Sequence, residues 1–339
     1  MEPALLEQLR DAVGGAVETE VSLDQISRWR IGGTARARVT ASTSAEVQRV
    51  VQIMSGRPEP LLVIGKTSNL LFDSRGFDGV LLQLGGSLET FGLEGTQVLA
   101  GGASDVFALA MAAGEAGLTG IEHIVGIPGT LGGLVAMNGG TRRRGIGENI
   151  LSIEVVTPEG ELREVTPEQA AFAYRTTSFQ DDRSVITRVK LQLQEGDRET
   201  ILSDMQRIQE ERAGKFPSDL PNCGSTFLSD PRMYEEIGPP GRAIEEAGLK
   251  GRRIGGAQIS PLHANFINNV GGASSDDVLN LIALIQGTVF ERSGYLMKCE
   301  VRYVSSTGKV CPASDPAVLA AIGADRSEAP APVSNEVKR

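Results

Sequence analysis

The sequence is poor in cysteine, histidine and aromatic residues, and these shortages exclude several classes of protein. Among 339 residues there are three cysteines and two histidines. Three cysteines cannot build a disulfide framework, and so few thiol and imidazole ligands argue against a metal site. No apolar run reaches the roughly 18–20 residues of a membrane-spanning helix, and residues 1–10 lack a signal-peptide pattern. We therefore expect a cytoplasmic protein without a metal site and without membrane contact.

The charge balance limits the partners of the chain further. Thirty-three basic residues stand against 43 acidic ones, for a net charge of −10. This balance argues against non-specific nucleic-acid binding, although a local basic pocket for a small anion stays possible. Apolar residues make up 40% of the chain, enough for a sizeable core, and the length favours two or three domains.

Glycine is abundant, with 41 residues against 16 prolines. The richest stretch, residues 126–140, combines six glycines with Pro128 and Asn138. Such a loop presents many backbone N–H groups with little side-chain bulk, which suits a pyrophosphate. A packed turn is the plainer alternative, but it would need fewer glycines.

Two familiar nucleotide motifs do not fit the other glycine clusters. Gly65, Lys66 and Thr67 end like a phosphate-binding P-loop, but position 60 is proline and an apolar strand at 61–64 abuts Gly65. The glycines after Gln97 follow a strand, yet they lack the dinucleotide-binding spacing.

Apolar periodicity predicts an α+β chain in several parts. The first part is an N-terminal helix segment over residues 1–21, with the helix itself at 2–16. Strands and helices then alternate over 22–194, with helices at 44–54 and 105–116, strands at 35–39, 61–64, 80–84, 97–100 and 184–193, and a hairpin at 153–165. A charged helix at 200–213 opens a second domain over 200–305, with strands at 225–228, 264–267 and 298–304 and helices at 242–247 and 275–289. The Ala-, Ser- and Pro-rich tail, 306–339, is expected to be disordered at its end.

Seven ordered motifs resemble one known family, the UDP-N-acetylenolpyruvoylglucosamine reductases (MurB family), in their short form. The resemblance covers the chain from about residue 22 to 304, through residues 27–33, 65–79, 126–140, 174–179, 223–227, 248–268 and 294–302. It implies an FAD-binding module of the PCMH or vanillyl-alcohol-oxidase type with two subdomains, followed by a smaller α+β substrate-binding domain.

The resemblance also implies a reaction. NADPH reduces FAD, and FAD then reduces UDP-N-acetylglucosamine enolpyruvate to UDP-N-acetylmuramate, a step in peptidoglycan synthesis and so in cell wall biogenesis, cell shape and division. The expected state is a monomer or weak oligomer in the cytoplasm.

The same resemblance assigns residues to roles. Ser225 is the implied general acid, and Arg175 and Glu300 polarise the substrate carboxylate. Taken singly, these three have plainer interpretations as a strand-edge hydroxyl, an ion-pair donor and a solvated carboxylate. The implied cofactor-binding residues are Gly65, Lys66, Thr67, Ser68, Asn69, Leu70, Ile127, Pro128, Gly129, Thr130, Gly132, Gly133, Asn138 and Ile186. The implied substrate-binding residues are Tyr174, Lys215, Ser229, His263 and Asn265.

The chain departs from the family pattern at two loops. Lys66 and Thr67 replace two glycines, so the lysine either donates to the flavin pyrophosphate or crowds it, and Arg142 to Arg144 replace small residues. These departures leave two alternatives open. One is a divergent paralogue that reduces another enolpyruvyl nucleotide. The other is a PCMH-type flavin oxidoreductase of different activity, for which His123 is the only histidine available as a flavin tether.

Overall fold

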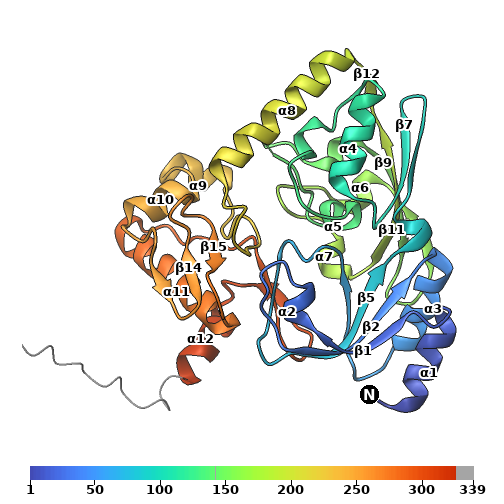
Figure 1. Ribbon diagram of the computed structural model, residues 1–339, viewed down its shortest axis with the longest axis horizontal. Coiled ribbons are helices and arrows are strands. Elements are labelled where there is room, and N and C mark those ends of the chain that lie inside the picture. Colours follow the sequence, from blue (N-terminus) through green and yellow to red (C-terminus); the bar gives the residue numbers. More distant parts are fainter. Residues whose placement is uncertain (142, 326–339) are drawn as a thin grey trace, which may run out of the picture.

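The computed structural model describes residues 1–141 and 143–325. Figure 1 shows two lobes joined by the long helix α8 (Arg198–Lys215), which runs from the N-terminal module to the C-terminal domain. Asp197 caps this helix by accepting from the Thr200 N–H at 2.9 Å. No helix within the described part of the chain is long and apolar enough to cross a membrane.

The first sheet of the N-terminal module has four strands in the order β1-β2-β5-β3. Strand β1 is antiparallel to β2, whereas β2 and β3 run parallel to β5. Helices α1 and α3 cover it with a core that includes Leu5, Leu9 and Val47. The bounds are β1 Val17–Ser22, β2 Thr34–Ala41, β3 Leu61–Ile64, β5 Phe77–Leu84, α1 Pro3–Ala12, α2 Leu23–Ile26 and α3 Ser44–Met54.

The second sheet is a five-stranded antiparallel one in the order β10-β9-β11-β7-β6. Its inner face packs against α4, α5 and one side of α8, where Ile201, Met205 and Ile208 are buried. The strands are β6 Phe91–Glu94, β7 Gln97–Gly101, β9 Ile150–Val156, β10 Leu162–Val165 and β11 Val185–Gln192, with the short pair β8 Leu118–Thr119 and β12 Gln194–Glu195 beside them. The helices are α4 Val106–Glu115, α5 Leu131–Ala136, α6 Pro167–Ala170 and α7 Phe179–Asp182, with 3-10 turns at Gly86–Leu88, Glu122–Ile124 and Ile146–Asn149.

The C-terminal domain packs helices on a small antiparallel sheet around its own core. Its elements are α9 Pro231–Glu236, α10 Pro240–Glu246, β13 Arg253–Ile254, β14 Ala257–Ile259, β15 Ile267–Asn269, α11 Ser275–Ser293 and α12 Pro316–Asp325.

Between α11 and α12 the chain returns to the N-terminal module through another three-stranded sheet. Strand β16 (Arg302–Val304) pairs antiparallel with β17 (Val310–Pro312) and parallel with β4 (Leu70–Phe72). Because β4 directly follows residues 65–69, this pairing brings the end of the C-terminal domain against a loop that is expected to bind flavin. Two distant parts of the sequence therefore meet at one place.

Three predictions about the ends of the chain were wrong. The first helix stops at Ala12 instead of reaching residue 16, because Gly14 and Gly15 both adopt positive φ. Residues 17–22 form strand β1 of the first sheet, so the segment 1–21 holds a helix and most of a strand instead of a helix alone. The tail predicted from residue 306 contains β17 and α12, and its last part, 326–339, lies outside the described residues.

Two predicted strands also differ. Residues 225–228 form an extended segment with one isolated bridge between Phe227 and Cys299 in place of a regular strand. The strand predicted at 264–267 lies at 267–269.

Candidate active site

A groove of about 1130 Å³ runs through the N-terminal module. Eight of the fourteen predicted cofactor-binding residues line it: Gly65, Lys66, Thr67, Leu70, Thr130, Gly132, Gly133 and Ile186. The loops at 65–70 and 126–133 are far apart in sequence, yet they touch, because a Cβ at Gly65 would lie 2.4 Å from Thr130 Oγ1. The structure therefore brings both glycine-rich loops to one cavity that is large enough for a dinucleotide.

Glycine is required where this groove crosses the second sheet. A Cβ at Gly102 would lie 2.1 Å from the carbonyl oxygen of Ile186, and Gly132 donates its N–H to the Gly102 carbonyl at 2.7 Å. The backbone segments are packed so closely that no side chain separates them. The groove floor is thus a surface of backbone groups, which fits the pyrophosphate expected from the sequence.

Lys66 has a carboxylate partner inside the module. Its ammonium forms an ion pair with Asp105, the N-cap of α4. Burial opposes ionisation of Asp105, but hydrogen bonds from Lys66 and from the Ala108 N–H outweigh it and lower the Asp105 pKa. Lys66 therefore lines the groove with its charge already partly balanced.

Six predicted cofactor residues do not line the groove: Ser68, Asn69, Ile127, Pro128, Gly129 and Asn138. Asn138 has a structural role, because its side chain accepts from the Gly147 N–H at 3.1 Å and donates to the Ala173 carbonyl at 2.8 Å. Asn69 donates to the carbonyl of Glu300 at 3.0 Å. The Asn69 side chain thus links the flavin loop to the segment that carries a predicted catalytic residue.

Arg175 and Glu300 form an ion pair, with Nε and Oε1 2.9 Å apart. The Nε–H is not aligned for a hydrogen bond, so the pair is held by charge. Two further N–H groups of the guanidinium donate to the carbonyls of Asn138 at 3.2 Å and Gly140 at 2.6 Å. Burial raises the pKa of the Glu300 carboxyl, and the charge of Arg175 opposes that rise. The pair therefore combines a fixed cation with a carboxyl that binds a proton more readily than usual.

Ser225 lies on the segment beside Glu300. The backbone N–H of Glu300 donates to the carbonyl of Thr226, the next residue, at 2.9 Å. Asn265 fixes the same segment, because its amide accepts from the Phe227 N–H at 2.9 Å and donates to the Phe227 carbonyl at 3.0 Å. Within residues 1–141 and 143–325, the half-buried Ser225 hydroxyl makes no hydrogen bond. It is therefore free to serve a ligand.

The observed contacts of Asn265 refine its predicted role. Both polar atoms of its side chain are occupied by Phe227, and the residue is 4% exposed. The contacts make it a residue that positions the Ser225 segment.

The other predicted substrate residues surround the same region. His263 packs against Phe216 and Phe266 with ring centroids 5.3 and 5.1 Å apart. Burial lowers the pKa of His263, so its imidazole is neutral at neutral pH, and the charge of Lys215 lowers that pKa further. The Tyr174 ring lies 5.5 Å from the Arg175 guanidinium, and the Ser229 backbone lies near the Tyr174 hydroxyl.

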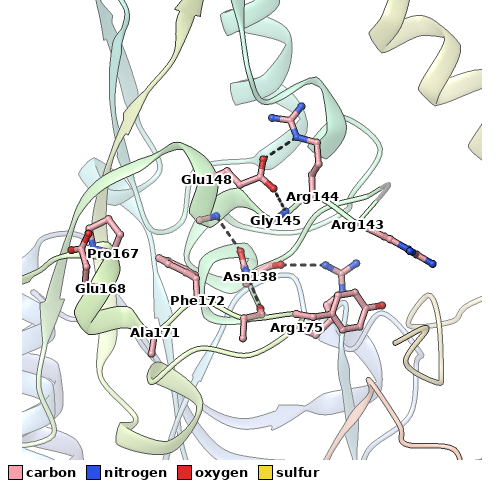
Figure 2. A pocket seen from close by; sticks show the side chains of 13 residues that line it. Asn138, Arg143, Arg144, Gly145, Glu148, Pro167, Glu168, Ala171, Phe172 and Arg175 are labelled. Atoms are coloured by element: carbon pink, nitrogen blue, oxygen red, sulfur yellow. Dashed lines mark hydrogen bonds and ion pairs between the residues drawn. The ribbon is translucent and has the colours of Figure 1, made fainter. Parts of the chain in front are cut away.

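A second cavity of about 620 Å³ lies beside Arg175 and is shown in Figure 2. Arg143 and Arg144, from the loop that departs from the family pattern, line it. Arg144 pairs with Glu148 at 3.0 Å and donates to the Gly120 carbonyl, whereas Arg143 lies over the ring of Tyr234, 5.0 Å from its centre. Arg144 thus binds partners of the N-terminal module, and Arg143 contacts Tyr234 in α9 of the C-terminal domain. Arg142 lies outside the described residues.

Sequence reasoning missed Arg302. This half-buried cation lines the groove, and within residues 1–141 and 143–325 its guanidinium makes one long hydrogen bond, from Nη1 to Gln180 Oε1 at 3.4 Å. The sequence could have indicated it, because Arg302 is two residues after Glu300 in the same motif, and residues two apart on an extended chain point to the same side. Arg302 is therefore a further candidate for contact with the cofactor.

The neighbourhood of His123 does not support its use as a flavin tether. The imidazole is 3% exposed and does not line the groove. Within residues 1–141 and 143–325, no group of three or more His, Cys, Asp and Glu residues is placed to hold a metal ion.

The groove and its glycine-rich loops fit a dinucleotide cofactor, and comparison with known proteins places the chain among FAD-binding oxidoreductases. Residues 35–166 match the family described as "FAD binding domain", and residues 216–304 match "UDP-N-acetylenolpyruvoylglucosamine reductase, C-terminal domain". The chain is 47% identical to UDP-N-acetylenolpyruvoylglucosamine reductase 1 of Corynebacterium glutamicum, over 91% of this chain and 92% of that protein. It is 37% identical to the Heliobacterium modesticaldum reductase, over 88% and 94%.

A solved structure agrees as well. The crystal structure of UDP-N-acetylenolpyruvylglucosamine reductase (MurB) from Thermus caldophilus superposes with a TM-score of 0.73 at 32% identity, covering 85% of this chain and 98% of that one. The chain belongs to the UDP-N-acetylenolpyruvoylglucosamine reductase (MurB) family. The resemblance carried by the seven motifs and the predicted two-domain α+β fold are thereby confirmed.

Proposed function

We propose that this protein reduces UDP-N-acetylglucosamine enolpyruvate to UDP-N-acetylmuramate, with NADPH as the reductant and FAD as the bound cofactor. The observation that carries the proposal is the contact between Arg175 and Glu300 beside the free hydroxyl of Ser225. The relatives that match over most of both chains are UDP-N-acetylenolpyruvoylglucosamine reductases, which supports the same reaction.

The chemistry explains why these three residues are needed together. The groove lined by Gly65, Thr130 and Gly132 would hold FAD, which when bound would supply the hydride for the terminal carbon of the enolpyruvyl group. Negative charge then develops on the carbon that bears the carboxylate and on the carboxylate oxygens. Arg175 balances this charge, and a protonated Glu300 can donate a hydrogen bond to the same oxygens. Both act in a partly buried setting, where such interactions are stronger than in water.

Ser225 completes the reaction by giving its proton to the carbon. A serine hydroxyl is a weak acid unless its conjugate base is stabilised, so the cation of Arg175 is needed near it. Asn265 holds the Ser225 segment through Phe227, which fixes the direction from which the proton arrives.

The remaining parts of the proposal concern the setting of the enzyme. We propose that it works in the cytoplasm as a monomer or weak oligomer, supplies the peptidoglycan pathway and so supports cell shape and division. A paralogue with another enolpyruvyl nucleotide as substrate is the competing proposal, because the loop at Arg143 and Arg144 departs from the family pattern.

A spectroscopic experiment separates these two proposals. The purified protein is expected to show a flavin spectrum, to bleach with NADPH under anaerobic conditions, and to recover when UDP-N-acetylglucosamine enolpyruvate is added. Bleaching without recovery favours the paralogue. A colourless protein that cannot be reconstituted with FAD contradicts both.

A further inference from the structure

The turn that carries Arg175 has an unfavourable backbone conformation. Ala173 and Thr176 close this four-residue turn through two backbone hydrogen bonds of 3.0 and 3.2 Å. Arg175 is the third residue of the turn and has a φ of 55°, in the left-handed region that glycine prefers. A residue with a side chain keeps such a conformation only where its surroundings fix it. The contacts of the Arg175 backbone therefore decide where its guanidinium lies.

The side-chain amide of Gln180, in α7, holds the Arg175 turn. Its Nε2 donates to the Arg175 carbonyl at 2.9 Å and to the Ala136 carbonyl at 3.1 Å. Ala136 is the last residue of α5, and its carbonyl also accepts from the Thr177 hydroxyl at 2.7 Å. Gln180 therefore ties the turn to a helix within the glycine-rich stretch 126–140.

The other polar atom of the Gln180 amide fixes its orientation. Oε1 accepts from Nη1 of Arg302 at 3.4 Å, and both residues line the groove. If the amide were flipped, its oxygen would face two carbonyls and its NH2 group would face a guanidinium, so neither end would have a partner. The position therefore needs a donor and an acceptor on the same side chain, which glutamine provides.

The guanidinium of Arg175 is held at the far end of the same residue. It donates to the carbonyls of Asn138 and Gly140 and pairs with Glu300 at 2.9 Å. Relaxation of the backbone out of the left-handed conformation would change the direction of the Cα–Cβ bond. The guanidinium would then leave either the two carbonyls or Glu300. The backbone contact at Gln180 and the ion pair are thus linked through one side chain.

We propose that Gln180 is a positioning residue for the second half of the reaction, and that its amide holds the Arg175 turn in the conformation that places the guanidinium beside Glu300. This inference rests on the proposed function, because Gln180 acts through the two residues that polarise the substrate carboxylate. Negative charge on the carboxylate oxygens grows in the transition state. Misplacing Arg175 therefore slows the reaction more than it weakens substrate binding.

Stopped-flow measurement of both half-reactions on the FAD-loaded protein tests the proposal. We expect Gln180→Met to slow reoxidation by UDP-N-acetylglucosamine enolpyruvate by about tenfold or more at saturation, with half-saturation within about threefold of wild type. Flavin reduction by NADPH should also stay within about threefold. Gln180→Glu, which keeps the acceptor and loses the NH2 donor, should slow reoxidation to a similar extent. The matched control is Gln206→Met on α8, where the exposed amide donates to Glu210 at 2.8 Å.

A double-mutant cycle shows whether Gln180 acts through Arg175. Reoxidation is already slow in Arg175→Ala, and we expect Gln180→Met to slow it by no more than about twofold further in that background. If the effects of the two substitutions multiply, Gln180 acts independently of Arg175 and the proposal is wrong.

Two further outcomes overturn the proposal. Reoxidation of both Gln180 variants at the wild-type rate removes the positioning role, while wild-type bleaching and recovery in the same experiment leaves the proposed function standing. Equal slowing of the two half-reactions, with weaker FAD binding and a lower melting temperature, assigns Gln180 to the packing of the groove. A wild-type protein that NADPH bleaches and the sugar nucleotide fails to reoxidise contradicts the proposed function and this inference with it.

Discussion

Arg175 and Glu300 come from different lobes of the molecule, and their charged atoms are 2.9 Å apart. Arg175 is held by two backbone carbonyls of the N-terminal module, whereas Glu300 is joined through its backbone to the segment of Ser225. The pair therefore fixes the two lobes relative to each other at the place where the reaction is proposed to occur. Its electrostatics lead to the first prediction.

Replacing Glu300 with glutamine is expected to change the pH dependence of the enzyme. The folded-state pKa of Glu300 is raised above its ordinary value of 4.5, chiefly by burial. The protonated form therefore stabilises the fold at low pH, and this contribution is lost as pH rises through the folded pKa. Because the reaction uses the protonated carboxyl, the turnover of the wild type should also fall as pH rises through the pKa of Glu300. The pH–rate profile of Glu300→Gln should lack this fall and have a lower maximum. Rate profiles over pH check this, and parallel profiles would contradict it.

Replacing His123 with leucine is expected to improve stability in acid. Burial, assisted by the charge of Arg144, lowers the pKa of His123 from 6.5 to about 4, and neither ring nitrogen has a hydrogen-bond partner among the described residues. Between pH 6.5 and 4 the His123 imidazole is therefore protonated in the unfolded chain and largely neutral in the folded chain. The free energy of unfolding thus decreases as pH falls through this range.

This loss amounts to about 3 kcal/mol from a pKa difference of roughly two and a half. Urea unfolding of His123→Leu and wild type across that pH range measures it. The prediction fails if both proteins lose stability in parallel.

Replacing Gly102 with alanine is expected to damage the flavin groove. The new Cβ would meet the Ile186 carbonyl at 2.1 Å, so the two backbone segments must separate. We expect FAD affinity to fall by about tenfold or more and the melting temperature to drop. Gly92→Ala is the control, because nothing lies within 4 Å of its added Cβ. FAD titration of both apoproteins gives the comparison, and equal affinities would show that the groove tolerates the change.

The sequence was most informative where motifs and local periodicity carried the signal. Strand 61–64 and helix 44–54 have the predicted bounds. The prediction for the N-terminus failed because the helix-like apolar spacing was followed past Gly14. The alternating residues 17–22 favour a strand. Helix α12 was missed because the tail was judged by its overall composition, which hides the largely apolar run of Pro316–Asp325.

Contacts between distant segments could not be predicted from periodicity. The bond from Asn69 to Glu300, the hold of Asn265 on Phe227 and the parallel pairing of β16 with β4 all depend on how the lobes pack. The motifs pointed to Asn138 and Asn265 as ligand contacts, yet both amides are hydrogen-bonded to backbone within the protein. An amide in a motif loop can bind a ligand or hold the backbone, and only its hydrogen-bond partners distinguish the two roles.

The central claim is that Ser225 supplies the proton in the second half of the reaction and takes no part in flavin reduction. Stopped-flow measurement of both half-reactions in Ser225→Ala tests it, with the exposed Ser218→Ala as control. We predict flavin reduction by NADPH within about twofold of wild type and reoxidation by UDP-N-acetylglucosamine enolpyruvate slower by about a hundredfold or more. Equal slowing of both half-reactions, or normal reoxidation, would contradict the account.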